Sequence, residues 1–135
     1  MEYLIGAGLG LATAALGHLI GFDRSRNFYP VVLIVIASYY VLFAVQASTA
    51  ALWLEVVLFG AFFLVSIIGF RFSLWVVIVG LAAHGLFDMI HDTLIDNAGV
   101  PRWWPGFCLA FDVIVAVYAA ARVSAVDTAR PPLGG

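Results

Sequence analysis

The chain has 135 residues, of which 64% are hydrophobic and only 10% are charged. A soluble domain is closer to half apolar and a quarter charged, so this composition excludes an ordinary soluble globular protein and indicates a polytopic membrane protein. The formal net charge is −2 and all basic residues are arginine, so there is no basic surface for binding nucleic acid.

Five apolar runs are each long enough to cross a hydrocarbon core of roughly 30 Å. We therefore predict an all-α fold, a polytopic membrane helical bundle of five transmembrane helices that forms a single domain over residues 1–126. The predicted spans are residues 3–22, 28–45, 51–70, 74–95 and 106–126, followed by a short polar tail at 127–135.

The first predicted span carries a stripe of small residues. Its members recur every three or four positions and are Gly6, Gly10, Ala14, Gly17 and Gly21. A stripe of this kind lets two helices approach closely, and we assign it to the contact of a homo-oligomer. His18 lies at the edge of the stripe, so we expect it to face protein rather than lipid.

The next three spans add polar groups to apolar helices. Pro30 falls in the first turn of the second span, where proline costs no helix hydrogen bond, and Tyr39 and Tyr40 follow in its second half. Glu55 lies about one turn into the third span, and Ser73 is a predicted N-cap for the fourth.

The longest connection, residues 96–105, contains a turn at 97–101 and an interfacial pair, Trp103 and Trp104. The fifth span contains Asp112, and Cys108 in the same span is interpreted as a small buried hydrophobe.

The arginines predict the orientation. One side of the predicted topology carries Arg24, Arg26, Arg71, Arg122 and Arg130, and the other carries only Arg102. Because basic loops stay in the cytoplasm, we expect an N-terminus outside and a cytoplasmic C-terminus.

The fourth span contains the motif that organises the others. His84, Asp88 and His91 are spaced i, i+4 and i+7, with Asp92 directly after, so on a helix they share one face. Ionisable side chains are costly in hydrocarbon, and we expect this face to look inward. Asp92 is close to the helix end and is expected to be in contact with water.

The predicted topology also converts position into depth, at about 1.5 Å per residue. Glu55, Asp88, His91 and Asp112 then fall in one slab of the outer leaflet, with Tyr39 and Tyr40 at a similar level and His84 somewhat deeper. We therefore predict one polar site built from several helices.

The leading interpretation of this site is a metal centre. Asp88 and His91 form a carboxylate-x-x-histidine pair, like the Glu-x-x-His pairs of di-metal bundles, and imidazole with carboxylate ligands suits Zn, Fe or Mn. We assign His84, Asp88 and His91 to the metal. Asp112, Glu55 and Tyr39 are the candidate catalytic groups, completing the shell or acting as general base or proton donor. The expected function is a metal-dependent enzyme of hydrolase or isomerase type that acts on a lipid-like or apolar small molecule.

Four alternatives stay open. An aspartate–histidine pair without metal can perform acid–base chemistry. The same groups can serve as the relay of a proton-coupled transporter, which would need to oligomerise. His18 and His84 are predicted to lie at similar depths in the membrane, so a haem held by these two histidines is a further interpretation. Finally, buried polar pairs can simply join helices in a structural subunit of a membrane assembly.

Two stretches, residues 84–92 and 97–108, followed by Asp112, resemble a group of small uncharacterised bacterial inner-membrane proteins, and residues 23–30 fit the same resemblance. The resemblance covers nearly the whole chain and implies an integral protein of the bacterial inner membrane, but it brings no substrate. In metal-binding logic alone, the chain is also loosely similar to multi-span hydrolases that hold zinc with His and Asp from several helices.

Overall fold

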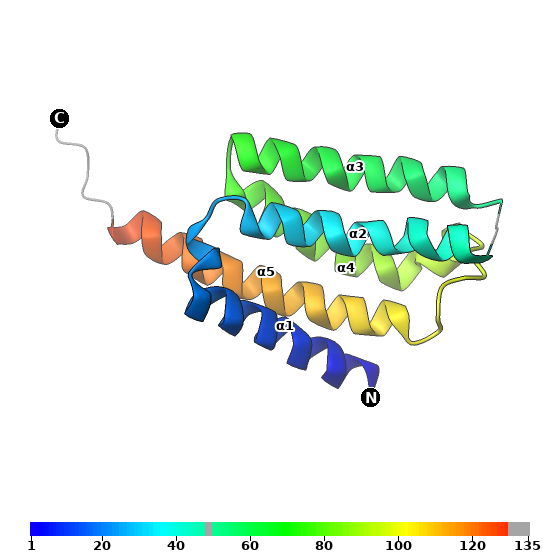
Figure 1. Ribbon diagram of the computed structural model, residues 1–135, viewed down its shortest axis with the longest axis horizontal. Coiled ribbons are helices and arrows are strands. Elements are labelled where there is room, and N and C mark those ends of the chain that lie inside the picture. Colours follow the sequence, from blue (N-terminus) through cyan, green and yellow to red (C-terminus); the bar gives the residue numbers. More distant parts are fainter. Residues whose placement is uncertain (48–49, 130–135) are drawn as a thin grey trace.

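The computed structural model describes residues 1–47 and 50–129 and is all-helical over these residues. Figure 1 shows five long helices, each running antiparallel to the one before it, and one short 3-10 turn. Their bounds are α1 Glu2–Ile20, η1 Phe22–Arg24, α2 Phe28–Ala47, α3 Leu52–Arg71, α4 Leu74–Leu94 and α5 Trp104–Ala129. All five helices are long and apolar enough to cross a membrane, which confirms the predicted all-α bundle with five candidate spans.

Local signals in the sequence explain where the helices end. Gly21 adopts a left-handed conformation (φ 85°) and ends α1, and its N–H donates to His18 O. The predicted N-cap Ser73 is confirmed, because its Oγ accepts a hydrogen bond from Trp75 N at 3.3 Å. α5 begins at Trp104, slightly earlier than predicted, and it continues to Ala129. The remainder of the predicted polar tail, including Arg130, lies outside the described residues.

The helices pack in an order that differs from the chain order. α1 packs on α5, α5 on α4, and α4 contacts both α3 and α2, which pack on each other. Figure 1 shows α1 and α3 at opposite edges of the bundle. The common apolar core lies between α2, α4 and α5, and its fully buried members include Leu33, Val77, Leu81 and Val115.

The glycine stripe of α1 is buried against α5. Gly6, Gly10, Ala14 and Gly17 are the buried residues of the helix. A Cβ on Gly6 would collide with the carbonyl oxygen of Phe107, and a Cβ on Gly10 would lie 3.0 Å from Phe111 O. The assignment of this face to a homo-oligomer contact is therefore wrong: the close packing it permits is used within one chain.

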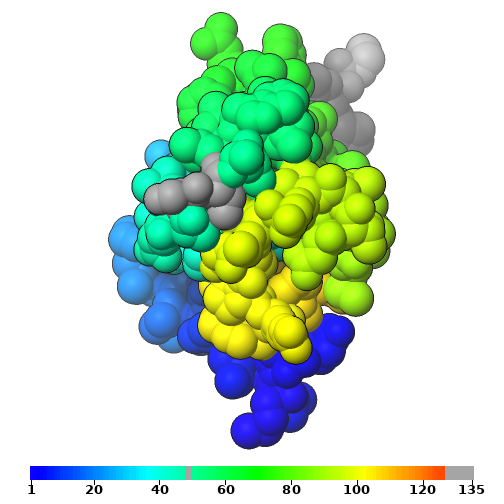
Figure 2. Space-filling view, turned by 90° about the vertical axis from the view of Figure 1, so that its right-hand side faces the viewer, coloured from blue at the N-terminus to red at the C-terminus, as the bar shows by residue number. Residues whose placement is uncertain are grey.

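The two ends of the bundle have different character. We call the end at which α1, α3 and α5 begin the asparagine end, after Asn97, and the opposite end, at which α2 and α4 begin, the arginine end, after Arg24, Arg26 and Arg122. Figure 2 shows the asparagine end, where the α4–α5 connection (yellow) lies between the start of α1 (blue) and the region where α2 ends and α3 begins (teal). A Cβ on Gly99 would collide with the carbonyl oxygen of Phe43, so this connection fits tightly over the end of α2.

Candidate functional site

The polar face of α4 points into the bundle. His84 and Asp88 are each 1% exposed and His91 is 0% exposed, whereas the side chain of Asp92 is 65% exposed. Glu55 from α3 and Asp112 from α5 are also buried, at 1% and 0%. The expectation that this face looks inward is confirmed, and Asp92 is exposed, as its expected contact with water requires. The five buried side chains form two groups rather than one.

The inner group joins α4 to α5. His84 Nδ1 lies 2.8 Å from Asp112 Oδ2 and 3.6 Å from Asp88 Oδ2. The helices can approach because Gly85 has no side chain; a Cβ there would lie 3.0 Å from Asp112 Cβ and 3.3 Å from Leu109 Cα. One ligand atom from each of His84, Asp88 and Asp112 falls within 4.8 Å of the other two.

Carboxylate oxygens in the inner group lack partners. Both oxygens of Asp88 and Oδ1 of Asp112 are buried without a hydrogen-bond partner in the part of the chain that the structure describes. A buried carboxylate is costly unless a proton, a cation or several donors compensate its charge. Two carboxylates share one imidazole here, so the group can accept further positive charge.

The donor set and spacing fit a divalent metal. Imidazole with carboxylate ligands suits Zn, Fe or Mn, and ligand bonds of about 2.1 Å hold neighbouring ligand atoms roughly 3–4 Å apart. The distances from His84 Nδ1 to the two aspartates, 2.8 and 3.6 Å, are close to that range. His84, Asp88 and Asp112 are thus the residues that could hold a metal with only small side-chain rotations.

The outer group joins α4 to α3. His91 Nε2 lies 2.9 Å from Glu55 Oε1, and His91 Nδ1 lies 3.3 Å from Asp92 Oδ1. Both ring nitrogens therefore face carboxylates, the arrangement through which an imidazole can pass a proton from one acid to another. Because Asp92 is exposed, the outer group connects the surface with the interior.

Asn97 closes the outer group at the asparagine end. Its Nδ2 donates to Glu55 Oε1 at 2.8 Å and to the carbonyl oxygen of Tyr40 at 3.2 Å. Its Oδ1 accepts from Gly99 N at 3.2 Å, a short-range contact typical of an asparagine turn. The sequence indicated the turn but not the bonds from the Asn97 side chain to Glu55 and Tyr40, because a turn motif does not show which way the amide points.

A tyrosine ring lies between the two groups, and it is not the one assigned as catalytic. The ring centroid of Tyr40 is 4.1 Å from that of His91 and 6.2 Å from that of His84. Tyr39 is 36% exposed and packs on Trp104, with ring centroids 5.0 Å apart. The structure therefore places Tyr40, whose hydroxyl has no partner among the described residues, at the site and Tyr39 outside it.

The structure groups the polar residues differently from the predicted site. The predicted metal set was His84, Asp88 and His91, whereas the structure brings Asp112 to His84 and Asp88 and pairs His91 with Glu55. A cavity of about 10 Å³ adjoins both groups, and its lining includes Tyr40, Glu55 and His84. That volume is near the minimum that one water molecule needs.

His18 does not belong to this site. It is exposed, and its Nδ1 lies 3.0 Å from Asp23 Oδ2, whereas His84 is bonded to Asp112 inside the bundle. The expectation that His18 faces protein holds only for its contact with Asp23, because 47% of the His18 side chain is exposed. The interpretation of His18 and His84 as paired haem ligands is not supported, because the two rings belong to different contacts.

Comparisons of the chain with protein-family models, with curated proteins and with solved structures found no match. A shared fold would in any case not establish an activity. The function is therefore argued from the geometry of the two polar groups.

Proposed function

We propose that the chain is an integral membrane protein of the bacterial inner membrane, with its N-terminus outside and its C-terminus in the cytoplasm. The outer faces of the helices carry many exposed large apolar side chains, while Glu55, His84, Asp88, His91 and Asp112 are among the most buried side chains. This distribution is favourable in lipid and unfavourable in water. Arg24, Arg26 and Arg71 lie at the arginine end and Arg102 lies at the other, which supports the orientation.

Within that membrane protein, we propose a metal-dependent enzyme. The observation that carries the proposal is the inner group: His84, Asp88 and Asp112 offer three ligand atoms within 4.8 Å, and three of their carboxylate oxygens have no partner among the described residues. A divalent metal, Zn, Fe or Mn, would compensate that charge. When bound, it would supply a Lewis acid that polarises a carbonyl or activates a water molecule.

The outer group supplies the acid–base chemistry in this proposal. Glu55 accepts a hydrogen bond from Asn97, lies 2.9 Å from His91 Nε2 and adjoins the same small cavity as His84. It is therefore placed to take a proton from a water molecule in that cavity. In the tautomer that carries its proton on Nδ1, His91 accepts the proton from Glu55 at Nε2 and releases the one on Nδ1 to exposed Asp92. Asp112, the other expected base, is instead a ligand here.

The proposed substrate is a lipid-like or other apolar small molecule that enters from the side of α3. α3 buries only Glu55, Ser66 and Gly69, and four of its residues line the small cavity: Glu55, Leu58, Phe59 and Phe62. An outward movement of this helix, which lies at the edge of the bundle, would enlarge the cavity toward the lipid, which suits a hydrolase or isomerase of membrane-soluble compounds. A homo-oligomer remains compatible with this proposal if its contact uses a face other than the glycine stripe.

Metal analysis of the purified protein tests the proposal. We expect a stoichiometric transition metal in the wild-type protein and its loss in Asp88→Asn, while Asp96→Asn, an exposed aspartate at the asparagine end, keeps the metal. The proposal fails if the wild-type protein, incubated with Zn, Fe or Mn and freed of excess, holds none of them. It also fails if Asp88→Asn retains full occupancy.

A second candidate, proton-coupled transport, is favoured by one observation. The contacts Asp92–His91 and His91–Glu55 form a path of titratable groups from an exposed carboxylate to the buried cavity. In liposomes, a transporter would acidify the lumen together with substrate movement, and His91→Phe would abolish the proton flux. A proton flux unchanged by His91→Phe would remove this candidate.

A further inference from the structure

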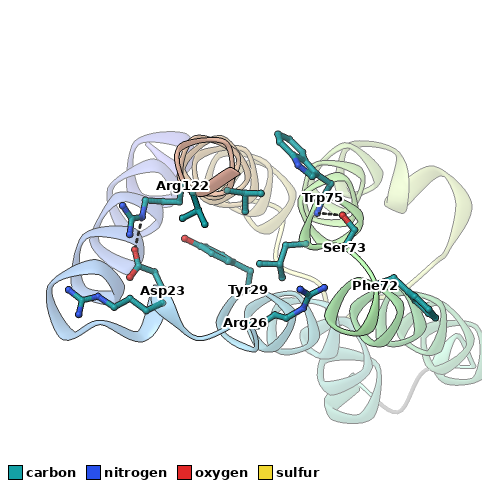
Figure 3. Close-up of a pocket in the computed structure, with 11 residues that line it drawn as sticks. Asp23, Arg26, Tyr29, Phe72, Ser73, Trp75 and Arg122 are labelled. Atoms are coloured by element: carbon teal, nitrogen blue, oxygen red, sulfur yellow. Dashed lines mark hydrogen bonds and ion pairs between the residues drawn. The ribbon is translucent and has the colours of Figure 1, made fainter. Parts of the chain in front are cut away.

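A second polar cavity lies at the arginine end, far along the helices from the site described above. It has a volume of about 580 Å³ and is bounded by η1, the starts of α2 and α4 and the C-terminal half of α5. Figure 3 shows its lining, with Asp23 and Arg122 on one side and Ser73 and Trp75 on the other. Nothing in the metal or proton chemistry proposed above uses this cavity.

The charged residues of its lining are mostly cationic. Arg24, Arg26 and Arg122 line it together with a single acid, Asp23. The side chain of Asp23 is 0% exposed, and its Oδ2 receives Arg122 Nε at 3.1 Å and lies 3.0 Å from His18 Nδ1. That acid is therefore already compensated, which leaves the charges of the other two arginines for a ligand.

Two further features add positive potential or order to the cavity. Arg26 Nε donates to the carbonyl oxygen of Phe70 at 2.6 Å, which fixes the guanidinium at the cavity while leaving its terminal nitrogens available. Ser73 and Trp75 form the N-terminal turn of α4, whose dipole is positive at this end. An anion in the cavity would thus face two arginines and a helix N-terminus.

A buried hydroxyl also lacks a partner here. Tyr29 is only 3% exposed and lines the cavity, and its hydroxyl has no hydrogen-bond partner within residues 1–47 and 50–129. Figure 3 shows the ring extending across the cavity toward Asp23 and Arg122. Buried hydroxyls are nearly always paired, so this one is free to bond to a group that enters the cavity.

We propose that this cavity binds a phosphate group, held by Arg24, Arg26 and the hydroxyl of Tyr29. Guanidinium groups match the oxygens of phosphate, and a buried tyrosine hydroxyl can donate to a third oxygen. The free Oδ1 of Asp23 suits a hydroxyl on the same ligand. Leu74, Trp75, Val123 and Val126 make the rest of the lining apolar, which fits the glycerol and upper acyl carbons of a phospholipid as well as a free phosphate compound.

Tryptophan fluorescence of the full-length protein in neutral detergent tests the proposal. The chain has four tryptophans, and Trp75 is the one that lines this cavity. At constant ionic strength, we expect a saturable change on titration with short-chain phosphatidylglycerol, absent in Trp75→Phe. Inorganic phosphate forms the second arm: saturation by phosphate alone indicates a soluble phosphate compound, and saturation by the lipid alone indicates a headgroup site.

Matched variants distinguish a specific binding site from nonspecific attraction of an anion to positive charge. Arg24→Gln and Tyr29→Phe should each weaken binding by about tenfold, as expected for the loss of one hydrogen bond to a charged group. Arg71→Gln removes an arginine at the same end that does not line the cavity, so it should leave binding unchanged. Asp88→Asn should also bind normally, because it changes only the metal group.

The proposal is overturned if neither ligand saturates the wild-type signal. It is equally overturned if Arg71→Gln weakens binding as much as Arg24→Gln does, since that result would indicate charge alone.

Discussion

His91 Nε2 lies 2.9 Å from Glu55 Oε1, a contact that joins two helices across 36 positions of sequence. Asn97 donates to the same oxygen at 2.8 Å, so the carboxylate is bonded from α4 and from the connection that follows it. In a bundle whose outer surface is apolar, these polar contacts give α3 a specific position that apolar packing alone would not.

The first prediction follows from this contact. Glu55→Ala should lower the free energy of unfolding by about 3–5 kcal/mol, because it removes the buried carboxylate that His91 and Asn97 share. Glu55→Gln should cost less, about 1 kcal/mol, because its amide oxygen can still accept a hydrogen bond. Denaturant titration in detergent micelles, followed by circular dichroism, gives both values.

Glu2→Ala is the matched control for this pair. Its side chain is 39% exposed and bonds only to the adjacent N-terminus among the contacts described, so we expect a change within about 0.5 kcal/mol. A variant Glu55→Ala as stable as Glu2→Ala would mean that the buried pair adds nothing to the stability of the bundle.

The second prediction concerns the glycine stripe of α1. Gly6→Ala should destabilise the protein by about 1–3 kcal/mol, because the added methyl group meets the backbone of α5 at Phe107 and one of the helices must move. Gly8 lies on the same helix, and a methyl group added there would have no described neighbour within 4 Å, so Gly8→Ala should cost nothing. Thermal unfolding of the two variants side by side measures the difference.

The same pair of variants bears on the oligomer. Since the stripe contacts α5 of its own chain, Gly6→Ala should leave the mass of the detergent complex unchanged, as measured by light scattering. A change of oligomeric state in Gly6→Ala and not in Gly8→Ala would show that the stripe also serves a contact between chains.

The third prediction concerns acid stability through Asp23, which lies in η1 between α1 and α2. Burial of its carboxylate raises its pKa, but the hydrogen bond with His18 and the nearby Arg122 charge outweigh this, and the pKa lies below the ordinary value of 3.8. A lowered pKa in the folded state stabilises the protein above the ordinary pKa, and this contribution is lost as the pH falls through the folded value.

Asp23→Asn removes that contribution and its pH dependence together. We therefore expect wild type to be more stable than Asp23→Asn at pH 6 and the difference to shrink below about pH 4, as measured by thermal unfolding across the range. Asp96→Asn, at the opposite end and exposed, should keep the wild-type pH profile. A difference that grows on acidification would contradict the lowered pKa of Asp23.

The sequence predicted the helices well because apolar runs and capping residues are local signals. Ser73, the predicted N-cap, begins α4 through a bond from Trp75 N. Gly21, predicted as a member of the glycine stripe, instead ends α1 through a bond to His18 O, so the first helix ends two residues earlier than predicted. The inward face of α4 was also predictable, because His84, Asp88 and His91 repeat with the helical period and are too costly to place in lipid.

Partner choice could not be predicted in the same way. Depth placed Glu55 and Asp112 at similar levels, but only the packing order decides that Asp112 meets His84 while Glu55 meets His91. Tyr39 and Tyr40 differ by one position and hence by about 100° of rotation, which a run without polar periodicity does not resolve. The glycine stripe, likewise, shows that some helix comes close but not which one.

The last prediction separates function from stability at Asp88. Both of its oxygens are buried without a hydrogen-bond partner among the described residues, and the nearest imidazole nitrogen, His84 Nδ1, lies 3.6 Å away. A carboxylate kept in such a place lowers the stability of the metal-free protein. In the presence of a chelator, Asp88→Asn should therefore unfold at higher denaturant than wild type, by at least about 1 kcal/mol.

Addition of metal should reverse that order. A ligand that binds only the folded state stabilises it by RT ln(1 + [L]/Kd), about 2.7 kcal/mol at a hundredfold excess over Kd, and only wild type retains the full set of ligands. Asp92→Asn, whose side chain is 65% exposed in wild type, should follow wild type under both conditions. If Asp88→Asn is the less stable protein even with chelator, then the Asp88 carboxylate stabilises the fold without a metal. The proposed metal centre would then lose its principal support.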